Sequence, residues 1–332
     1  MQKDRKGYAP VIVTVYDRPL HFKRCIESLS KNIHASETTL FISSDGPKDS
    51  QSIERIAQVR NYIKSISGFK RVIPFNAEEN TKGAIVREVR DRVYEFSDRY
   101  IFSEDDNVFS PYFLDYMNSA LDLYEDDKRI RAISGYMYPG YQSRQLQPIL
   151  IQAFAAWGCG LWRDKDVLTP DFDQRLFAQE IFSDWALFTR INNALPHMAS
   201  MLKEVANGRL IAADVTRSAL LVKHDWYCVY PTISMVRNIG YDGTGEHCCF
   251  NKNYMNQEIC EDKMIFDESI PLQFDASIQD WIHEYLGGWT AALKNKLIFF
   301  EQNAESEILR RLYRFVHKNI GLPRRIVRGL VR

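Results

Sequence analysis

Residues 99–117, RYIFSEDDNVFSPYFLDYM, place three carboxylates at the end of an apolar run. Glu104, Asp105 and Asp106 follow a stretch rich in Tyr, Ile and Phe, and Ser110 and Pro111 then supply the N-cap and first position of an expected helix. Adjacent carboxylates repel and raise one another's pKa, so they do not stabilise a fold by themselves. Either they bind a divalent cation, or they form a solvated acidic turn that caps the helix.

The segments before this stretch alternate between strand and helix patterns. Strands are expected at residues 10–16, 39–47, 70–75 and 99–103, with helices at 20–33, 52–66 and 84–96. Such alternation predicts parallel strands joined by right-handed crossovers, and therefore an α/β fold with a doubly wound sheet. Ligands bind outside the carboxyl ends of strands in such sheets, and the acidic triplet lies at one of these ends.

Beyond residue 127 the alternation weakens. Residues 129–140 and 149–165 read as strand material, 183–195 and 200–207 as helices, and 230–248 as a loop with several glycines. Since no Pro/Ser-rich linker separates the two halves, we expect one continuous globule with a C-terminal helical tail.

Composition narrows the class of protein. The 332 residues are 45% hydrophobic and 26% charged with a net charge of +0, typical of a folded protein and against a general nucleic-acid binder. From Ile308 onward the sequence has eight Lys/Arg and no acidic residue, so residues 1–307 sum to −8. No apolar run reaches the ~20 residues that span a bilayer, and the start of the chain lacks the apolar region of a signal peptide. We therefore expect a cytoplasmic protein. In that compartment its cysteines should be reduced.

Two further strand ends carry polar residues but no phosphate-binding glycine motif. The chain lacks both GxxxxGK[ST] and a GxGxxG after its first strand. The first strand instead ends in TVYDRP and the second in SSDGP, which bring Asp17, Arg18 and Asp45 to the same sheet edge. Asp45 could accept from a pyrimidine N–H, and Arg18 could donate to the carbonyl of that base or to phosphate. The alternative is that Asp45-Gly46-Pro47 is a simple turn.

The sequence resembles glycosyltransferases with the GT-A fold. The segments APVIVTVYDRPLHFKRCIESL, LFISSDG, YIFSEDDNVFSPYFLDYMNSAL, FSDWALFTRI and YPTISMVRNIGYDGTGEHCCF occur in that family's order and spacing, across residues 9–250. Within the family the sequence is similar to the N-acetylglucosaminyltransferase I group, which is inverting and uses UDP-N-acetylglucosamine and manganese. The resemblance implies a nucleotide-sugar-binding mixed sheet, and Mn²⁺ or Mg²⁺ as cofactor.

The resemblance also implies roles for individual residues. It assigns the metal to Asp106, the uridine to Arg18 and Asp45, and the sugar and ribose to Glu104 and Asp105. It also assigns the catalytic base to Asp184, while residues 234–247 match a loop that closes over the donor. His247 either completes the metal shell or is incidental, and Trp157 either stacks on sugar or packs in the core. The expected donor-binding residues are Asp17, Arg18, Asp45, Glu104, Asp105, Trp157, Ser234, Gly243 and Gly245.

The chemistry gives Asp184 a role independently of the resemblance. Inverting transfer needs a carboxylate to take the proton of the attacking hydroxyl. A single base is enough, because a metal stabilises the leaving diphosphate. The alternative is that Asp184 is the N-cap of the helix that follows it.

The expected function is transfer of a sugar, N-acetylglucosamine by resemblance, from a UDP donor to a glycan or lipid-linked saccharide in surface polysaccharide synthesis. Residues 1–127 would bind the donor, 128–300 the acceptor, and 301–332 form a basic amphipathic tail. In that tail Ile308, Leu309, Leu312, Phe315 and Val316 share a helical face, which either lies on the inner membrane surface or packs on the acidic body. The alternatives are an inactive glycan-binding or scaffold subunit, and a sugar-nucleotide pyrophosphorylase, which needs a Gly-rich loop after the first strand.

Overall fold

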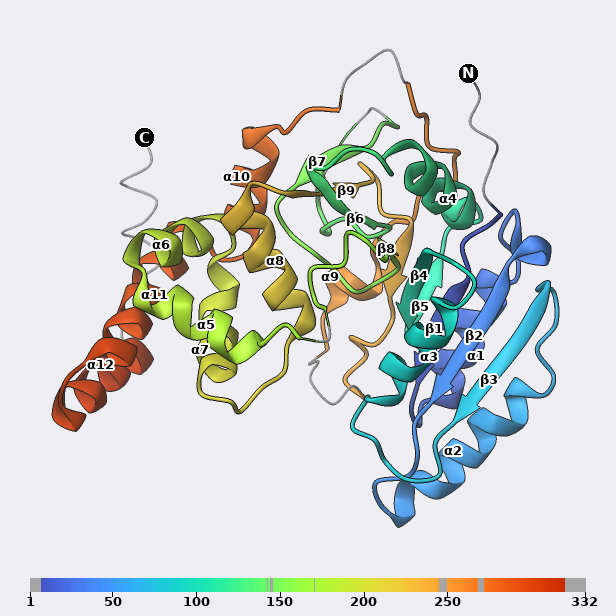
Figure 1. Cartoon of the computed structure of the whole chain (residues 1–332), viewed down its shortest axis with the longest axis horizontal. Helices are drawn as coiled ribbons and strands as arrows, with labels where there is room; N and C mark the ends of the chain where they lie inside the picture. Colours follow the sequence, from blue (N-terminus) through green and yellow to red (C-terminus); the bar gives the residue numbers. More distant parts are fainter. Residues whose placement is uncertain are drawn as a thin grey trace. The chain divides into compact units, whose positions relative to one another are not determined.

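A computed structural model describes residues 7–141, 143, 146–169, 171–244, 250–267 and 272–319. Within these residues the chain forms an eight-stranded sheet, a two-stranded ribbon and a set of helices (Figure 1). The strands are β1 (Val11–Val15), β2 (Thr39–Ser44), β3 (Arg71–Asn76), β4 (Arg99–Glu104), β5 (Asn107–Phe109), β6 (Ile130–Ser134), β7 (Ile149–Ile151), β8 (Cys159–Trp162), β9 (Tyr227–Tyr230) and β10 (Val236–Asn238). The helices are α1 (Pro19–Leu29), α2 (Ser50–Ile63), α3 (Ile85–Val93), α4 (Phe113–Leu123), α5 (Gln174–Ser183), α6 (Trp185–Ala194), α7 (Ala199–Ala206), α8 (Ala213–His224), α9 (Lys252–Met255), α10 (Ala276–Tyr285), α11 (Gly288–Asn303) and α12 (Glu307–Asn319), with 3₁₀ turns η1 (Ala35–Glu37) and η2 (Pro196–Met198).

The large sheet is mixed, with the strand order β3-β2-β1-β4-β8-β6-β9-β7. β1 pairs in parallel with both β2 and β4, and β2 pairs in parallel with β3, whereas β8 runs antiparallel to β4 and β6. Val11, Ile12 and Val13 of β1 are fully buried, as expected for a central strand covered on both faces. The prediction of an α/β fold with a mixed sheet is confirmed.

The path from β4 to the next helix differs from the prediction. Ser110 and Pro111 were expected to start that helix, but α4 begins at Phe113 and the short strand β5 comes first. The backbone N–H of Ser110 donates to the carbonyl of Met235 at 2.8 Å, and β5 pairs with β10. Pairing with a distant segment therefore holds this stretch extended and overrides the local helix-start signal.

Two glycines let α4 approach the sheet closely. A Cβ on Gly160 of β8 would lie 2.9 Å from Cε of Met117, and one on Gly135 would lie 2.6 Å from the ring of Phe113. Both glycines thus have a packing role, since a larger residue would push the helix away.

The chain divides into two compact units. The first comprises Met1–Leu150, Ala155–Asp166 and Cys228–Gln273 and contains the parallel strands and the β5–β10 ribbon. The second comprises Ile151–Phe154, Val167–Tyr227 and Phe274–Arg332, and its described elements are mainly helices. The expected continuous globule is thus built from two units, each assembled from several segments. The functional division at residue 127 stays a prediction.

The C-terminal tail begins with the predicted helix. Its first part is α12, and residues 320–332 lie outside the described residues. Across the described ranges, every helix is too short or too polar to cross a lipid bilayer.

Candidate functional site

The acidic triplet lies at the carboxyl edge of the parallel strands. β4 ends at Glu104, which pairs with Thr14 of β1, and Asp105 and Asp106 form the turn into β5. β1 ends at Val15, so the following residues leave the sheet beside this turn. The strand register therefore brings Arg18 next to carboxylates that are far away in the sequence.

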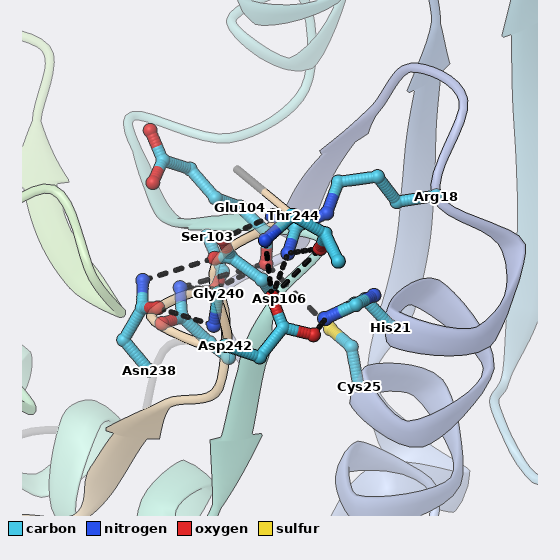
Figure 2. Close-up of polar contacts among 11 residues, drawn as sticks. Arg18, His21, Cys25, Ser103, Glu104, Asp106, Asn238, Gly240, Asp242 and Thr244 are labelled. Carbon is cyan, nitrogen blue, oxygen red and sulfur yellow. Dashed lines mark hydrogen bonds and ion pairs between the residues drawn. The ribbon is translucent and has the colours of Figure 1, made fainter. Parts of the chain in front are cut away.

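Both carboxylate oxygens of Asp106 are bound by other side chains. Nη1 of Arg18 donates to Oδ2 at 2.8 Å, and the amide Nδ2 of Asn238 donates to Oδ1 at 3.0 Å (Figure 2). The side chains of Arg18 and Asp106 are only 19% and 13% exposed. Asp106 is therefore held in a shielded ion pair and is not part of a solvated turn.

The β5–β10 ribbon brings the partner loop to Asp106. Asn238 ends β10 opposite Asn107 of β5, and its side-chain oxygen accepts the N–H of Gly240 at 2.7 Å. The N–H of Ile239 donates to the backbone carbonyl of Asp106 at 2.8 Å. A Cβ on Gly240 would lie 2.0 Å from Oδ2 of Asp106, so only glycine fits here without displacing the carboxylate.

Arg18 also contacts a second acidic residue in this loop. Its Nη2 lies 3.7 Å from Oδ1 of Asp242 and donates to the hydroxyl of Thr244 at 3.3 Å. Oδ2 of Asp242 lies 3.0 Å from Nε2 of His21 in α1, and Oδ1 accepts from the N–H and hydroxyl of Thr244. Figure 2 shows these side chains converging on one point from three segments. We call Arg18, His21, Asp106, Asn238 and Asp242 the Arg18 cluster.

The environment of the cluster shifts two of its pKa values downward. Burial lowers the pKa of His21, the positive charge of Arg18 adds to this, and Asp242 opposes it. Burial alone would raise the pKa of Asp242, but hydrogen bonds from Thr244 and the charge of His21 outweigh it and lower that pKa. Sequence reasoning missed His21, Asn238 and Asp242, because each lies in a segment that gives no local sign of its partner.

Asp105 behaves differently from its neighbour. It is buried, and burial, followed by the negative charge of Asp106, raises its pKa to about 7, while Arg18 opposes the shift. The thiol of buried Cys25 lies 3.7 Å from the carbonyl oxygen of Glu104, and burial with the nearby Asp105 and Asp106 raises its pKa. The carboxyl group of Asp105 is therefore about half protonated near pH 7, whereas the thiol of Cys25 stays protonated.

Glu104 ends β4 but does not join the cluster. Its side chain points away from Asp106 in Figure 2, and its backbone carbonyl accepts from Ser103 and Cys25. Its proposed contact with the sugar or ribose stays a prediction.

Asp45 organises a loop at the end of β2. Its carboxylate accepts the backbone N–H groups of Gly46 and Thr81 at 2.8 Å and of Gly83 at 3.0 Å. Burial would raise its pKa, but these hydrogen bonds outweigh burial and lower it. The turn interpretation thus describes part of what Asp45 does, and contact with a pyrimidine stays a prediction.

Other expected donor-binding residues have structural partners outside the cluster. Asp17 pairs with Arg55 through Oδ2. The buried hydroxyl of Ser234 accepts from the N–H of Met137 at 3.0 Å and donates to the carbonyl of Val236 at 2.6 Å. Gly243 has φ +90°, which suits glycine in the loop that carries Asp242. Gly245 and His247 lie outside the described residues.

Trp157 lies in an aromatic group near the same loop. Its ring meets Tyr136, Tyr241 and Tyr254 in edge arrangements at centroid distances of 4.8, 5.9 and 5.8 Å, and it is half-buried. The packing interpretation therefore accounts for its aromatic contacts, and stacking on a sugar stays a prediction.

Asp184 belongs to the second unit and caps a helix there. It is exposed, precedes α6, and accepts the N–H groups of Ala186 at 2.8 Å and Leu187 at 3.1 Å. This is the N-cap arrangement considered from the sequence. A role as catalytic base stays a prediction.

Among the described residues, the carboxylate of Asp106 is the candidate ligand for a divalent cation. Within the described part of the chain, no group of three or more His, Cys, Asp and Glu side chains could hold a metal ion. Asp106 has a carboxylate at the sheet edge, but Arg18 and Asn238 occupy it. Mg²⁺-type sites can use one or two protein carboxylates with substrate phosphates and waters, and Asp106 would fit that mode if Arg18 released its carboxylate.

Comparison with known proteins gives low similarities. No protein-family profile and no curated protein matches the chain. A structure of TarS 1-349 from S. aureus aligns with TM-score 0.34 and 14% identity over 48% of this chain and 50% of that chain. A longer TarS structure gives TM-score 0.30 and 14% identity over 45% of this chain and 27% of that chain.

A third structure is aligned over most of the chain. It is a mannosyltransferase, PcManGT from Pyrobaculum calidifontis, in complex with GDP-Man and Mn²⁺, with TM-score 0.37 and 10% identity over 93% of this chain and 83% of that chain. The aligned region spans half or less of the two TarS chains. The fold assignment rests on the strand order and register of this chain.

Proposed function

We propose that the chain is an inverting glycosyltransferase that moves N-acetylglucosamine from a UDP donor to a hydroxyl of a glycan or lipid-linked saccharide. The observation that carries the proposal is the Arg18–Asp106 pair at the carboxyl edge of the parallel strands. A cation and a carboxylate at this edge suit a sugar nucleotide, because the diphosphate needs positive charge and a metal needs an oxygen ligand.

Arg18 is the proposed diphosphate ligand in the donor site. Its guanidinium contacts Asp106 and Asp242, and its buried Nε has no hydrogen-bond partner among the described residues. A phosphate oxygen is a stronger partner for guanidinium than the 3.7 Å contact to Asp242, since charge-assisted bidentate hydrogen bonds are short. Donor binding would therefore turn Arg18 toward the diphosphate and free an oxygen of Asp106.

Asp106 and, from the segment outside the described residues, His247 are the proposed ligands of Mn²⁺ or Mg²⁺. A bound divalent cation would neutralise the charge that develops on the departing diphosphate. Arg18 would contribute to the same neutralisation, and Asp105 and Glu104 would orient the ribose and sugar. Asp17, Asp45, Trp157, Ser234, Gly243 and Gly245 are proposed to complete the donor pocket.

Asp184 is the proposed general base. The acceptor oxygen would attack the anomeric carbon, its proton would pass to the Asp184 carboxylate, and the bond to the UDP oxygen would break, so that the configuration inverts. Serine caps helices about as well as aspartate but cannot act as this base. An Asp184→Ser variant therefore separates the two roles.

We expect Asp184→Ser to keep the free energy of unfolding within about 0.5 kcal/mol of the parent chain. Its turnover should fall about 100-fold or more, because general-base catalysis contributes at least that factor. Urea unfolding and UDP release measure the two quantities. Parent-like turnover would leave Asp184 as a helix cap only.

The main experiment measures donor turnover. Purified protein is incubated with UDP-N-acetylglucosamine and Mn²⁺, with and without saccharide acceptors, and UDP release is followed. We expect slow hydrolysis without acceptor, loss of activity on chelation, and about 100-fold lower turnover in Asp106→Asn. Asp91→Asn, an exposed carboxylate on α3 with 60% of its side chain accessible, is the control and should be unaffected.

Three outcomes would contradict this proposal. If Asp106→Asn keeps full, Mn²⁺-dependent turnover, Asp106 is not the metal ligand and the site assignment fails. If no UDP- or GDP-sugar is bound or hydrolysed, the chain is better described as an inactive glycan-binding or scaffold subunit. Formation of a UDP-sugar from UTP and a sugar phosphate would indicate a pyrophosphorylase instead.

The acceptor and location are also proposals. Surface polysaccharides and lipid-linked saccharides are assembled at the inner face of a membrane, so we propose that the chain acts there as a peripheral protein. The basic tail is the part of the sequence that supports this location.

A further inference from the structure

The helix α12 is attached to its own unit by its polar face. Arg310, Tyr313, Arg314 and His317 follow the i, i+3, i+4, i+7 spacing of one helical face. Nε of Arg314 donates to the carboxylate of Glu301 in α11 at 2.9 Å, and Nε of Arg310 donates to the carbonyl of Ala304 at 3.1 Å. This face therefore packs against the end of α11 through ion pairs and hydrogen bonds.

Further contacts make this attachment specific. Glu301 is buried, with 4% of its side chain exposed, and it also pairs with Lys203 of α7 at 2.7 Å. The ring of Tyr313 packs beside Phe300 of α11 at a centroid distance of 5.9 Å. Because Glu301 has two cationic partners, the charged side of α12 is fixed on the protein.

The opposite face of α12 is apolar and turned outward. Ile308, Leu312 and Phe315 follow the i, i+4, i+7 spacing and are 80%, 51% and 65% exposed, and Leu309 beside them is 42% exposed. We call Ile308, Leu309, Leu312 and Phe315 the outer stripe. An amphipathic helix usually buries its apolar side, so this orientation is the reverse of ordinary packing.

Cationic side chains border the outer stripe. Arg311 has 76% of its side chain exposed and pairs along the helix with Glu307, and Lys318 is exposed near the end of the helix. The sequence that follows adds Arg324, Arg325, Arg328 and Arg332 without any acidic residue. Figure 1 shows α12, in red, beside α11, which has exposed Trp289, Leu293 and Phe300 of its own.

We propose that the outer stripe of α12 inserts into an anionic lipid surface. A lipid interface accepts the apolar side chains and attracts the cations that border them. A second copy of the chain is a poorer occupant, because two such helices face to face would bring Arg311 and Lys318 against like charges. Lipid binding by this face does not depend on the proposed transferase activity.

The test is sedimentation of the full chain with vesicles. One set contains equal parts of phosphatidylglycerol and phosphatidylcholine, and the other contains phosphatidylcholine alone. We expect about tenfold tighter binding to the anionic set, and loss of most binding when salt is raised to about 0.5 M.

Two variants and one control assign the binding to this face. Ile308→Asn, Leu312→Asn and Phe315→Asn together should weaken binding to anionic vesicles about tenfold or more. Arg311→Gln with Lys318→Gln should weaken it less and remove much of its salt dependence. Leu210→Asn with Ile211→Asn replaces apolar residues that are 38% and 83% exposed elsewhere in the same unit, and should bind as the parent does.

Other results would overturn the proposal. Parent-like binding by the triple variant, or equal binding to both vesicle sets, would show that the outer stripe does not select anionic lipid. If light scattering shows a dimer that the triple variant converts to a monomer, the stripe is an interface between copies. Circular dichroism of each variant confirms that α12 and the fold are retained, and UDP release on a water-soluble acceptor tests the catalytic proposal separately.

Discussion

Arg18 is the residue on which the candidate site depends most. Its guanidinium lies 2.8 Å from one carboxylate and 3.7 Å from another, in a part of the molecule where only about a fifth of its side chain is exposed. Such a shielded cation stabilises the negative charge of Asp106, which would otherwise be left without compensation. Replacing Arg18 or Asp106 alone should therefore lower the free energy of unfolding more than replacing both.

A double-mutant cycle measures this coupling. Arg18→Gln should lower the free energy of unfolding by about 1.5–3 kcal/mol, the range for hydrogen bonds to charged groups. Adding Asp106→Asn should recover part of that loss, because the uncompensated charge is gone. Urea unfolding of the parent, the two single variants and the double variant gives the coupling. If the losses in the two single variants sum to the loss in the double variant within about 0.5 kcal/mol, Arg18 and Asp106 are not coupled.

Asp105 makes stability depend on pH in a defined direction. The folded chain holds the proton of this carboxyl up to about pH 7, whereas an aspartate in the unfolded chain has its ordinary pKa of 3.8. Between these values the folded state binds more protons, so this group's contribution to stability falls as pH rises and is fully lost above about pH 7.

Replacing Asp105 by Asn removes that dependence. Relative to the parent, Asp105→Asn should gain stability between about pH 4 and about pH 8, by an amount on the order of 4 kcal/mol at most. Urea unfolding at several pH values in a buffer with chelator measures the difference, with Asp91→Asn as control. A stability difference that does not change with pH would show that Asp105 ionises normally.

At the scale of elements, the β5–β10 ribbon and the loop after it form one side of the site. β10 ends at Asn238, which binds Asp106, and Gly240 and Asp242 follow in the loop. These contacts depend on the close approach of Gly240 to the Asp106 carboxylate. The loop therefore controls the position of a side chain that the proposed chemistry needs.

Gly240→Ala tests that control. The added Cβ would lie 2.0 Å from Oδ2 of Asp106, so the carboxylate must move away from Arg18 or Asn238. We expect a loss of about 1–3 kcal/mol in the free energy of unfolding, typical of overpacking, together with loss of UDP release. Gly140→Ala is the control: Gly140 lies outside the proposed site and its Cβ would meet nothing within 4 Å, so only the strain of φ +89° should appear, about 1–2 kcal/mol.

The loop held by Asp45 gives a second prediction at this scale. Asp45→Asn replaces one carboxylate oxygen with an NH₂ group that cannot accept a hydrogen bond. The N–H of Thr81 or that of Gly83 then loses its acceptor, at a cost of about 1–3 kcal/mol. Hydrogen exchange at the N–H groups of residues 81 and 83 should speed up. Asp49→Asn, at the N-cap of α2 where Asn serves as well, should change little. Unchanged exchange in Asp45→Asn would remove its organising role.

At the scale of the whole molecule, the four parallel strands could be predicted from the sequence because each is a short apolar run, and a helical pattern separates each from the next. Val11–Val15 and Arg99–Glu104 match the expected strands within one residue at each end. The same pattern placed the acidic triplet at a sheet edge, and that placement is confirmed by the register of β1 and β4.

The contacts around the triplet could not be predicted, because they join segments with no local relation. His21 and Asp242 are 221 positions apart, and Arg18 and Thr244 are 226 apart. Similarly, helical periodicity identified the two faces of α12 but not which one packs on the protein, since an ion pair to buried Glu301 decides that.

The order of strands in the large sheet has a consequence for synthesis on the ribosome. β9 lies between β6 and β7, yet it is made only after about half of the second unit, at Tyr227–Tyr230. Until that point the emerging polypeptide has an unpaired edge at β6, the kind of edge that promotes aggregation in partly made proteins. The nascent chain therefore has to avoid aggregation while the nearly one hundred residues between β6 and β9 are translated. This strand order thus creates a need for chaperones during expression.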